Sequence, residues 1–500
     1  MITQISQGSG GGSSADEKAK VSSNDTTAGY LNGKLVAGTN VTLTENNNGG
    51  DETLTISAAG GVTGFTSSQN TASPNNTVNA SRLLVDATST NADIVLQPKG
   101  SGAILAQLPD GTNTGGNKRG ASAVDFQRSR SDNFNVASGS GSCIITGNSN
   151  TNSSTYAGIV GGEFNTITSS APQSFIGAGY LNTINNSCDQ SFIGSGQSNQ
   201  LTTNSGYGVI CGGMSNTITN SAYSAVLSGR SNNAGRANSV ISGGQTNTMS
   251  TAGTHHTIVG GQGNTTTATH CAILGGQNNA ASAQHAVISG GRDQIASGTY
   301  STVSGGYANT ASGTYSASVG YGNTSSGESS NTSGNGNTAS SAISNAHGFQ
   351  SVANNYGMYS YASGRFTANG DAQLQEQLLR CITTNNTATL LVSDGLTAGT
   401  SIAVANDTTI GFDILVVARR TDADNESSSW RITGCIDNNA GNTAFVGTPT
   451  VTAQGDDSAG AWTIAVQANN TDDRLEIVGT GENSKTIRWL AHARCVKITG

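Results

Sequence analysis

The chain has 500 residues and a formal net charge of −8, and only 10% of its residues are charged. Typical globular domains carry about 25% charged residues, so this composition is unusual for an enzyme. The acidic balance argues against a nucleic-acid-binding surface, and no apolar run approaches the roughly 18 residues of a membrane span. Glycine is abundant at 68 residues and proline is scarce at 5. Together with apolar residues that recur in order, this favours a repeat protein whose neighbouring coils cover one another.

The N-terminal region predicts hairpins and no export signal. Its first residues lack a basic segment followed by an apolar one, so we expect no signal peptide. Residues 29–61 alternate apolar and polar positions around the turn sequence NNNGGDE, and residues 92–111 do so around PKGSG. Each stretch predicts an antiparallel β-hairpin. We assign residues 1–62 to an N-terminal region with a β-hairpin and residues 63–137 to a β-rich connector.

Residues 138–366 form a ladder of short repeats. One apolar residue recurs every 15 or 17 positions, once after 14, and is usually followed by glycine three positions later and by Asn or Gln six positions later. A helix would need a different apolar spacing, so the pattern predicts stacked short strands, about 4.8 Å per coil, in a shaft on the order of 65 Å long. The apolar rungs are Ile144, Ile159, Ile176, Ile193, Ile210, Leu227, Ile241, Ile258, Ile273, Ile288 and Val303.

The other fixed positions of the repeat have separate explanations. Glycine at a constant place marks backbone that a Cβ would hinder, although Arg230 stands there in one coil. The constant Asn suits either a left-handed backbone residue or a ladder of side chains between coils. The coil shortens along the chain, from mostly 17 residues to 15 and then to roughly 14, which predicts a roll that thins toward its C-terminal end.

Many rungs have an apolar neighbour, as in Phe175–Ile176 and Val240–Ile241. Adjacent strand residues point to opposite faces, so the second apolar side chain needs a surface outside the coil. The pattern therefore favours association of several chains over a wide monomeric solenoid.

The last segment, residues 367–500, is richer in charge and holds all three tryptophans. Residues 411–439, 461–480 and 485–498 alternate apolar and polar side chains, which predicts an antiparallel β-sandwich-like domain. The whole chain is therefore expected to be all-β.

Two resemblances give these segments a function. The stretch TYSASVGYGNTSSG (314–327) and its neighbours resemble the head repeats of trimeric autotransporter adhesins, which implies a left-handed parallel β-roll with three chains, although the family's usual coil has 14 residues. Residues 29–61, 92–111 and 115–139 and the C-terminal block resemble parts of tailed-phage fibre proteins.

The fibre resemblance implies a homotrimer located in the virion and synthesised in the host cytoplasm. We expect a tail fibre that joins a tail, baseplate or adaptor protein through its N-terminal region. Its C-terminal domain loops would bind a host polysaccharide or protein receptor, through residues the sequence does not identify. A head fibre without a receptor role and a polysaccharide-depolymerising tailspike are the alternatives. No cofactor, nucleic acid or membrane insertion is expected.

Little in the repeats suggests chemistry. Glycan-cleaving sites need two carboxylates about 5–10 Å apart, and the four acids of residues 141–366 lie in different repeats, so we expect no enzyme. The residues His255, His270, His285, Tyr300 and Tyr315 are spaced by 15 and should stack as a column. A metal site among three chains is one explanation of the histidines, and aromatic stacking, favoured by the tyrosines, is the other. Arg419–Arg420 lies at a strand end, and Arg128 and Arg130 lie in the junction before the repeats. Each predicts a solvated strand or turn end or, as a second hypothesis, a contact with an anionic glycan.

Overall fold

The computed structural model describes residues 30, 35–37, 41–46, 53–58, 65–69, 79–83, 95–250, 252–395, 400–423, 426–456 and 461–500. These residues are all-β, as predicted, and the chain divides into two compact units, Met1–Gln97 and Pro98–Gly500. Within the described residues, no helix is long and apolar enough to cross a membrane.

The first unit contains two antiparallel strand pairs. Strands β1 (Val41–Asn46) and β2 (Thr53–Ala58) pair with Val41 opposite Ala58, which confirms the strands of the predicted hairpin, while most of its turn lies outside the described residues. Strands β3 (Phe65–Gln69) and β4 (Asn79–Leu83) form a second pair within the stretch assigned to the connector.

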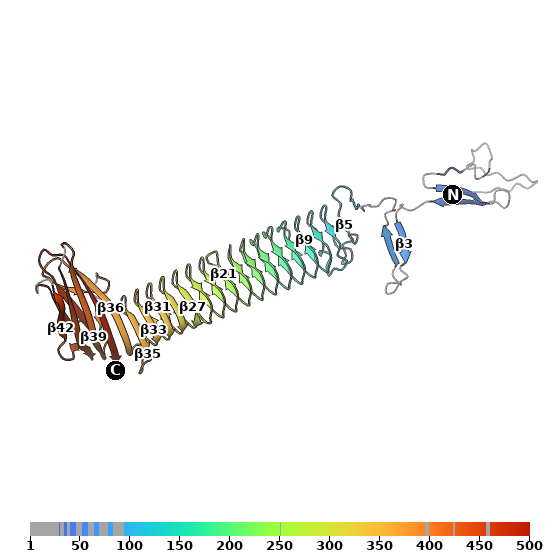
Figure 1. Cartoon of the computed structure of the whole chain (residues 1–500). Coiled ribbons are helices and arrows are strands. Elements are labelled where there is room, and N and C mark those ends of the chain that lie inside the picture. The colour runs from blue at the N-terminus through green and yellow to red at the C-terminus, as the bar shows by residue number, and fades with distance from the viewer. Residues whose placement is uncertain are drawn as a thin grey trace, which may run out of the picture. The chain divides into compact units, whose positions relative to one another are not determined.

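The second unit is a parallel β-roll followed by a β-sandwich (Figure 1). Most coils of the roll contribute one strand to each of two parallel sheets. Sheet A carries the rungs and consists, within the roll, of β5 (Ile104–Leu105), β6 (Val124–Asp125), β7 (Cys143–Ile144), β9 (Gly158–Ile159), β11 (Phe175–Ile176), β13 (Phe192–Ile193), β15 (Val209–Ile210), β17 (Ala225–Val226), β19 (Val240–Ile241), β21 (Thr257–Ile258), β23 (Ala272–Ile273), β25 (Val287–Ile288), β27 (Thr302–Tyr307), β29 (Ala317–Tyr321), β31 (Asn331–Asn335), β33 (Asn345–Phe349) and β35 (Tyr359–Ser363).

Sheet B has 14 strands and covers another side of the roll, with a span of about 60 Å at ~4.8 Å per strand. A third column of single parallel bridges, such as Asn148 to Glu163, closes the coil. The strands of sheet B are β8 (Thr151–Asn152), β10 (Thr166–Ile167), β12 (Thr183–Ile184), β14 (Gln200–Leu201), β16 (Thr217–Ile218), β18 (Asn233–Ala234), β20 (Thr248–Met249), β22 (Thr265–Thr266), β24 (Ala280–Ala281), β26 (Ile295–Ala296), β28 (Thr310–Ala311), β30 (Thr324–Ser325), β32 (Thr338–Ala339) and β34 (Val352–Ala353).

The register confirms the ladder at ten of its eleven rungs and corrects one. All the predicted rungs except Leu227 are fully buried and pair with the rungs of adjacent coils. In the remaining coil Val226, not Leu227, pairs with Ile210 and Ile241, and Leu227 points outward. Val226 and Leu227 are both apolar, and the rung predicted from the sequence is the wrong one of the two. With Val226 as the rung, Gly229 takes the glycine position, so this coil has no Arg in its place.

The coil shortens as predicted. Paired rungs lie 17 residues apart from Ile159 to Ile210, and 14 apart from Ser318 to Ser360. The inward side chains of sheet B change in the same direction, from Ile184 to Ala296 and Ala353, and all of them are buried. A smaller interior needs less chain to surround it.

The constant Asn forms a side-chain ladder inside the roll, which decides between the two explanations of that position. Asn199 donates its backbone N–H to Oδ1 of Asn182 at 3.0 Å, and its own Oδ1 accepts the N–H of Asn216 at 3.0 Å. Its amide Nδ2 also donates to the carbonyls of Ser195 (3.1 Å) and Gly213 (2.9 Å). The ladder therefore satisfies buried backbone groups at the corner of each coil.

The constant glycine is required by both conformation and space. Gly196 has a φ of 106°, in the region that favours glycine, and a Cβ there would collide with the carbonyl oxygen of Gly213 in the next coil. The prediction that the backbone could not accommodate a side chain here is confirmed.

The N-terminal end of the roll is closed by a buried ion cluster. Asp125 occupies a rung position of sheet A and pairs with Arg119 (2.7 Å) and Arg130 (3.3 Å), and all three side chains are buried. Gln127 begins the Asn ladder by accepting the N–H of Asn150 at 2.9 Å. Arg130 had been predicted to be a solvated turn end, which is wrong.

This end also corrects the second predicted hairpin. Ile104–Leu105, in residues 92–111, pairs in parallel with Val124–Asp125 and begins sheet A, so it is not half of an antiparallel hairpin. A strand of an antiparallel hairpin and a strand of a parallel roll show the same alternation of apolar and polar residues. The alternation therefore could not tell whether the partner strand follows after a turn or lies one coil away.

The C-terminal end of the roll is closed by side chains that substitute for a strand. Gln373 accepts the N–H of Val352 in β34 at 2.9 Å and donates to its carbonyl at 2.8 Å. Next to it, three backbone N–H groups, from Phe366 to Ala368, donate to the buried carboxylate of Asp371. Burial opposes ionisation of Asp371, but these bonds outweigh it and lower its pKa to about 2.

Sheet A continues from the roll into the C-terminal domain. Strand β36 (Ala372–Thr383) pairs antiparallel with β35, and β45 (Ile487–Thr499), β39 (Thr408–Arg420) and β40 (Ser427–Asn439) follow in that order. Strands β41 (Asn442–Phe445) and β42 (Thr450–Asp456) both pair with β40. We call the part of this sheet from β36 onward the C-terminal sheet.

A smaller antiparallel sheet completes the predicted sandwich. It contains β37 (Ala388–Leu391), β44 (Arg474–Thr480), β38 (Ile402–Ala403) and β43 (Thr463–Asn469). The inward side chains of both sheets form one buried core, which includes Leu379, Val416, Trp462 and Trp489.

Candidate functional site

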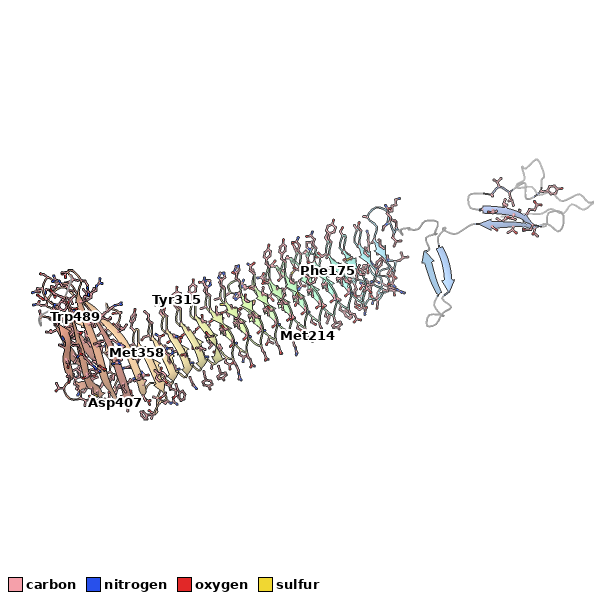
Figure 2. All side chains as sticks on the ribbon, viewed as in Figure 1. Phe175, Met214, Tyr315, Met358, Asp407 and Trp489 are labelled. Atoms are coloured by element: carbon pink, nitrogen blue, oxygen red, sulfur yellow. The ribbon has the colours of Figure 1, made fainter. Side chains whose placement is uncertain are left out.

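One outward face of sheet A runs along the roll and into the C-terminal domain. In the roll its exposed side chains are largely apolar, whereas sheet B presents mostly threonine outward. At the junction Tyr361 pairs with Leu374, and both are exposed on this face. Figure 2 draws the side chains on the ribbon and labels Phe175, one of the exposed apolar residues of the roll. We give the name apolar stripe to a set of exposed aliphatic and phenylalanine side chains of the roll that lie in a strand of sheet A or directly after one: Ile145, Val160, Phe175, Phe192, Leu227, Val240, Val259, Leu274 and Val319.

The C-terminal sheet is apolar on its outer face as well. Leu378, Ile382, Leu415 and Leu490 are all about half exposed, although each lies within a regular strand. Monomeric proteins rarely leave so many neighbouring large apolar side chains in water, which marks this face as an interaction surface.

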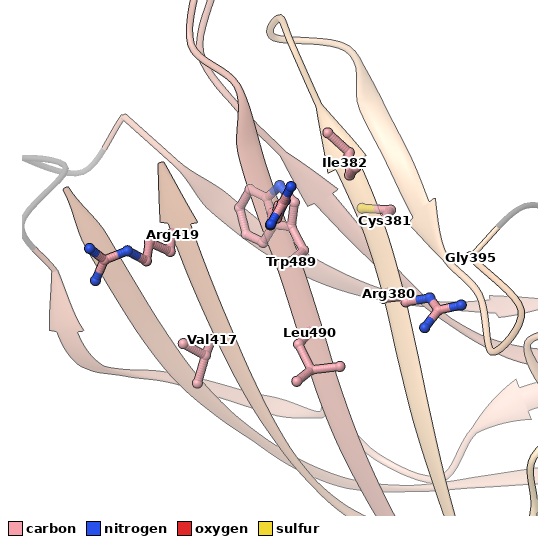
Figure 3. A pocket seen from close by; sticks show the side chains of 9 residues that line it. Arg380, Cys381, Ile382, Gly395, Val417, Arg419, Trp489 and Leu490 are labelled. Atoms are coloured by element: carbon pink, nitrogen blue, oxygen red, sulfur yellow. The ribbon is translucent and has the colours of Figure 1, made fainter. Parts of the chain in front are cut away.

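Two hollows lie on this outer face. The first, about 490 Å³ in volume, lies over β36, β45 and β39 and is lined by Arg380, Ile382, Val417, Arg419, Arg488 and Leu490, among others. In Figure 3 Arg380 and Arg419 lie on either side of Leu490 and Val417. We call it the arginine hollow.

The second hollow, about 600 Å³, lies nearer the roll and contains a paired charge network. Asp413 accepts from Arg431 at 2.8 Å and from Arg494 at 2.6 Å. The hydrogen bond from Arg431 is the main reason that the pKa of Asp413 lies below its usual value. His492 lies 3.4 Å from Glu376 on the neighbouring strand. The charges here largely satisfy one another.

Two charged loops of the C-terminal domain are also tied together by ion pairs. Arg420 pairs with Asp422 at 2.6 Å and with Glu426 at 2.9 Å, and Lys485 pairs with Glu426 at 2.8 Å. The hydrogen bond from Lys485 is the largest cause of the lowered pKa of Glu426. This network holds two loops of the sandwich together, while residues 424–425 of the same segment lie outside the described residues.

The three tryptophans do not offer a binding surface. Trp430, Trp462 and Trp489 are all buried, and the rings of Trp430 and Trp489 stack at 5.6 Å between centroids. They belong to the core of the sandwich. A sequence shows that a tryptophan lies on an alternating strand, but not which of the two strand faces is covered.

The histidine column is present as predicted. Successive rings from His255 through His270 and His285 to Tyr300 and Tyr315 stack with centroids 4.7–5.1 Å apart, along an exposed corner of the roll where the backbone φ is positive. Rings stacked in parallel do not direct their nitrogens toward a common point. Within the described part of the chain, no group of three or more metal-ligating side chains is close enough to hold a metal ion.

The residue beside this column, His256, gives the roll a predicted sensitivity to acid. It points inward, its Nδ1 has no hydrogen-bond partner among the described residues, and burial lowers its pKa. A lowered pKa means that the unfolded chain binds the proton more tightly, so stability should fall as pH drops below about 6.5. The equivalent position of the preceding coil is Ser239.

We therefore expect the melting temperature of the His256→Ser protein to fall less between pH 7.5 and pH 5 than that of the unmodified protein. The exposed histidine column is present in both proteins and cancels in the comparison. Thermal melts followed by circular dichroism across this range test the expectation, and identical pH profiles for the two proteins would contradict it.

The acids of the roll are not brought together. Glu163 lies in the column of single bridges, and Asp293 pairs with its neighbour Arg292 at 3.2 Å. Among the described residues of the roll, no two of the four acidic residues in the range 141–366 are linked by a hydrogen bond or share an ion-pair partner.

Comparison with known proteins shows only remote likeness. No protein-family model and no curated protein sequence matches the chain. The solved tailspike protein gp49 of Acinetobacter baumannii bacteriophage Fri1, a capsular polysaccharide depolymerase, aligns over 75% of this chain and 79% of its own, with 8% identity and a TM-score of 0.17. The tailspike of Acinetobacter phage vB_ApiP_P1 aligns over 80% of each chain, with 9% identity and a TM-score of 0.21. Scores this low carry no argument about function.

Proposed function

We propose that this chain is a homotrimeric virion fibre, a tail fibre that attaches a phage to its host by multivalent binding. One observation carries the proposal: a rod of stacked coils presents an unpartnered apolar stripe along the same sheet that continues into the C-terminal domain. Two further copies of the chain can cover this stripe along its length, because the coils that carry it present it on the same side. The sequence resemblances to adhesin heads and phage fibres support the same assembly.

The mechanism of such a fibre is avidity. Three copies of a weak site at the end of one rod bind a repetitive surface more strongly than one copy does, without any tight single contact. The N-terminal region would join a tail, baseplate or adaptor protein, and the C-terminal domain would meet a host polysaccharide or protein. We propose no enzymatic step, since the acids of the roll are dispersed and Asp413 is held between two arginines.

Antibodies raised against the C-terminal domain and against the roll test this proposal. We expect gold-labelled antibodies to mark the tail in electron micrographs of virions, and antibodies to the C-terminal domain to slow adsorption to host cells. Labelling of the capsid would contradict the tail location and favour a head fibre. Adsorption blocked only by antibodies to the roll would contradict the assignment of binding to the C-terminal domain.

A further inference from the structure

The arginine hollow brings like charges together without compensation. Arg419 on β39 lies directly opposite Arg488 on β45, and like charges at opposite positions of a sheet repel each other. Neither guanidinium has an ion pair or hydrogen bond with any of the described residues. On the same face, by contrast, Arg431 and Arg494 share the carboxylate of Asp413.

A third arginine increases the positive charge. Arg380 of β36 lies opposite Leu490 and lines the same hollow. Its guanidinium donates to the backbone carbonyl of Asp394 at 3.1 Å, a neutral acceptor that leaves its charge in place. The carboxylate of Asp394 accepts a hydrogen bond from Thr400 at 3.1 Å. A ligand with negative charge would relieve the repulsion among the three guanidinium groups.

The floor of the hollow limits the kind of anion. Val417, Leu490 and Ile382 are exposed between the arginines, so a ligand must also cover apolar surface. A small hydrated ion does not do this. A sugar ring with an acidic substituent does, because its C–H groups can lie on the apolar floor while a carboxylate or phosphate receives paired N–H bonds from a guanidinium.

The hollow also lies aside from the apolar stripe. Leu374 of β36 lies beside the roll, because it pairs with Tyr361 of β35. Arg380 is six residues further along β36, which is about 20 Å in an extended strand. Subunits that pack along the stripe therefore need not cover the hollow, and three copies of it remain available on one fibre.

We propose that the arginine hollow binds the anionic groups of an acidic polysaccharide, with Arg380, Arg419 and Arg488 as the binding residues. That the polysaccharide lies on a host cell rests on the proposed function. The binding itself can be measured on the purified protein. Arg419–Arg420 thus divide their roles, since Arg420 joins the ion pairs of the loops and Arg419 faces the ligand.

Calorimetric titration of the full-length protein at 0.15 M salt tests the proposal. The probes are oligogalacturonate for carboxylates, oligo(glycerol phosphate) for phosphates, and maltohexaose as the neutral control. We expect at least one acidic probe to bind and maltohexaose not to bind. We expect Arg419→Gln and Arg488→Gln each to weaken that binding at least tenfold. The matched control is Arg431→Gln, which removes the same charge from the same face and should change binding by less than threefold.

Three results would overturn the proposal: no acidic probe binds, Arg431→Gln weakens binding as much as the other variants do, or Arg488→Gln lowers the mass of the assembly in light scattering. The last result would make the arginines contacts of a neighbouring subunit. Binding of the acidic probe by a protein that does not slow phage adsorption would instead leave this site in place and contradict only the proposed attachment role.

Discussion

Replacing Ile241 with Asp should prevent the roll from folding. Ile241 is fully buried between the rungs Val226 and Ile258, and an aspartate there would place an unpaired carboxylate in an apolar interior. An uncompensated buried charge costs several kcal/mol of folding free energy. Because each coil is stabilised by packing on its two neighbours, the defect would interrupt the stack of coils near its middle. Expression with circular dichroism and limited proteolysis measures the outcome, and we expect cleavage around the altered coil or insoluble protein.

The adjacent residue gives a matched control for this substitution. Val240 lies on the same strand but points outward into the apolar stripe. Val240→Asp should keep the coil folded and instead disrupt association, so that light scattering gives a mass near 50.2 kDa in place of three times that value. A Val240→Asp protein that remains trimeric would show that the stripe is not the subunit interface, and a folded Ile241→Asp protein would contradict the assigned interior.

Replacing Asn199 with Leu should destabilise the roll by about 3 kcal/mol or more, although leucine has a similar size. The change removes the acceptor of the buried Asn216 N–H and the donor to the carbonyls of Ser195 and Gly213. Each buried polar group left without a partner costs roughly 1–3 kcal/mol. Hydrogen exchange should show faster opening of the coils around Asn199, and Asn186→Leu, at an exposed position in the preceding coil, should leave exchange unchanged.

The chain itself contains a natural variant of this ladder. Gln294 takes the Asn position in one coil, and its Oε1 accepts the N–H of Asn309 at 2.8 Å, but its Nε2 has no hydrogen-bond partner in the described part of the chain. Gln294→Asn should therefore stabilise that coil by about 1 kcal/mol, the net value of a typical hydrogen bond. Asn199→Gln should cost less than Asn199→Leu. Equal exchange rates for the leucine and glutamine variants would contradict the role of the side-chain oxygen.

Some of the candidate site was accessible from the sequence, and some was not. The adjacent apolar pairs correctly indicated that one side chain of each pair points out of the coil, and Arg419–Arg420 marked a strand end with an anionic glycan among its explanations. The arginine hollow itself could not be predicted, because it joins β36, β45 and β39, and β45 lies between two strands that precede it in the chain. The burial of the three tryptophans could not be predicted either, because alternation does not say which face of a strand is covered.

The sequence by itself determined the repeat, the parallel stack, the glycine and Asn positions of most coils, the shortening of the coil and the stacked histidine column. These follow from local periodicity, since each coil contacts only the coils next to it and the pattern is repeated many times. Only the tertiary structure decided which of Val226 and Leu227 is the rung, that Ile104–Leu105 begins the roll, and how its ends are closed. The closing residues, Asp125 with its arginines and Gln373 of β36, occur once each, so no periodicity marks them. Their role arises from the unpaired backbone and open core that a finite stack leaves at each end.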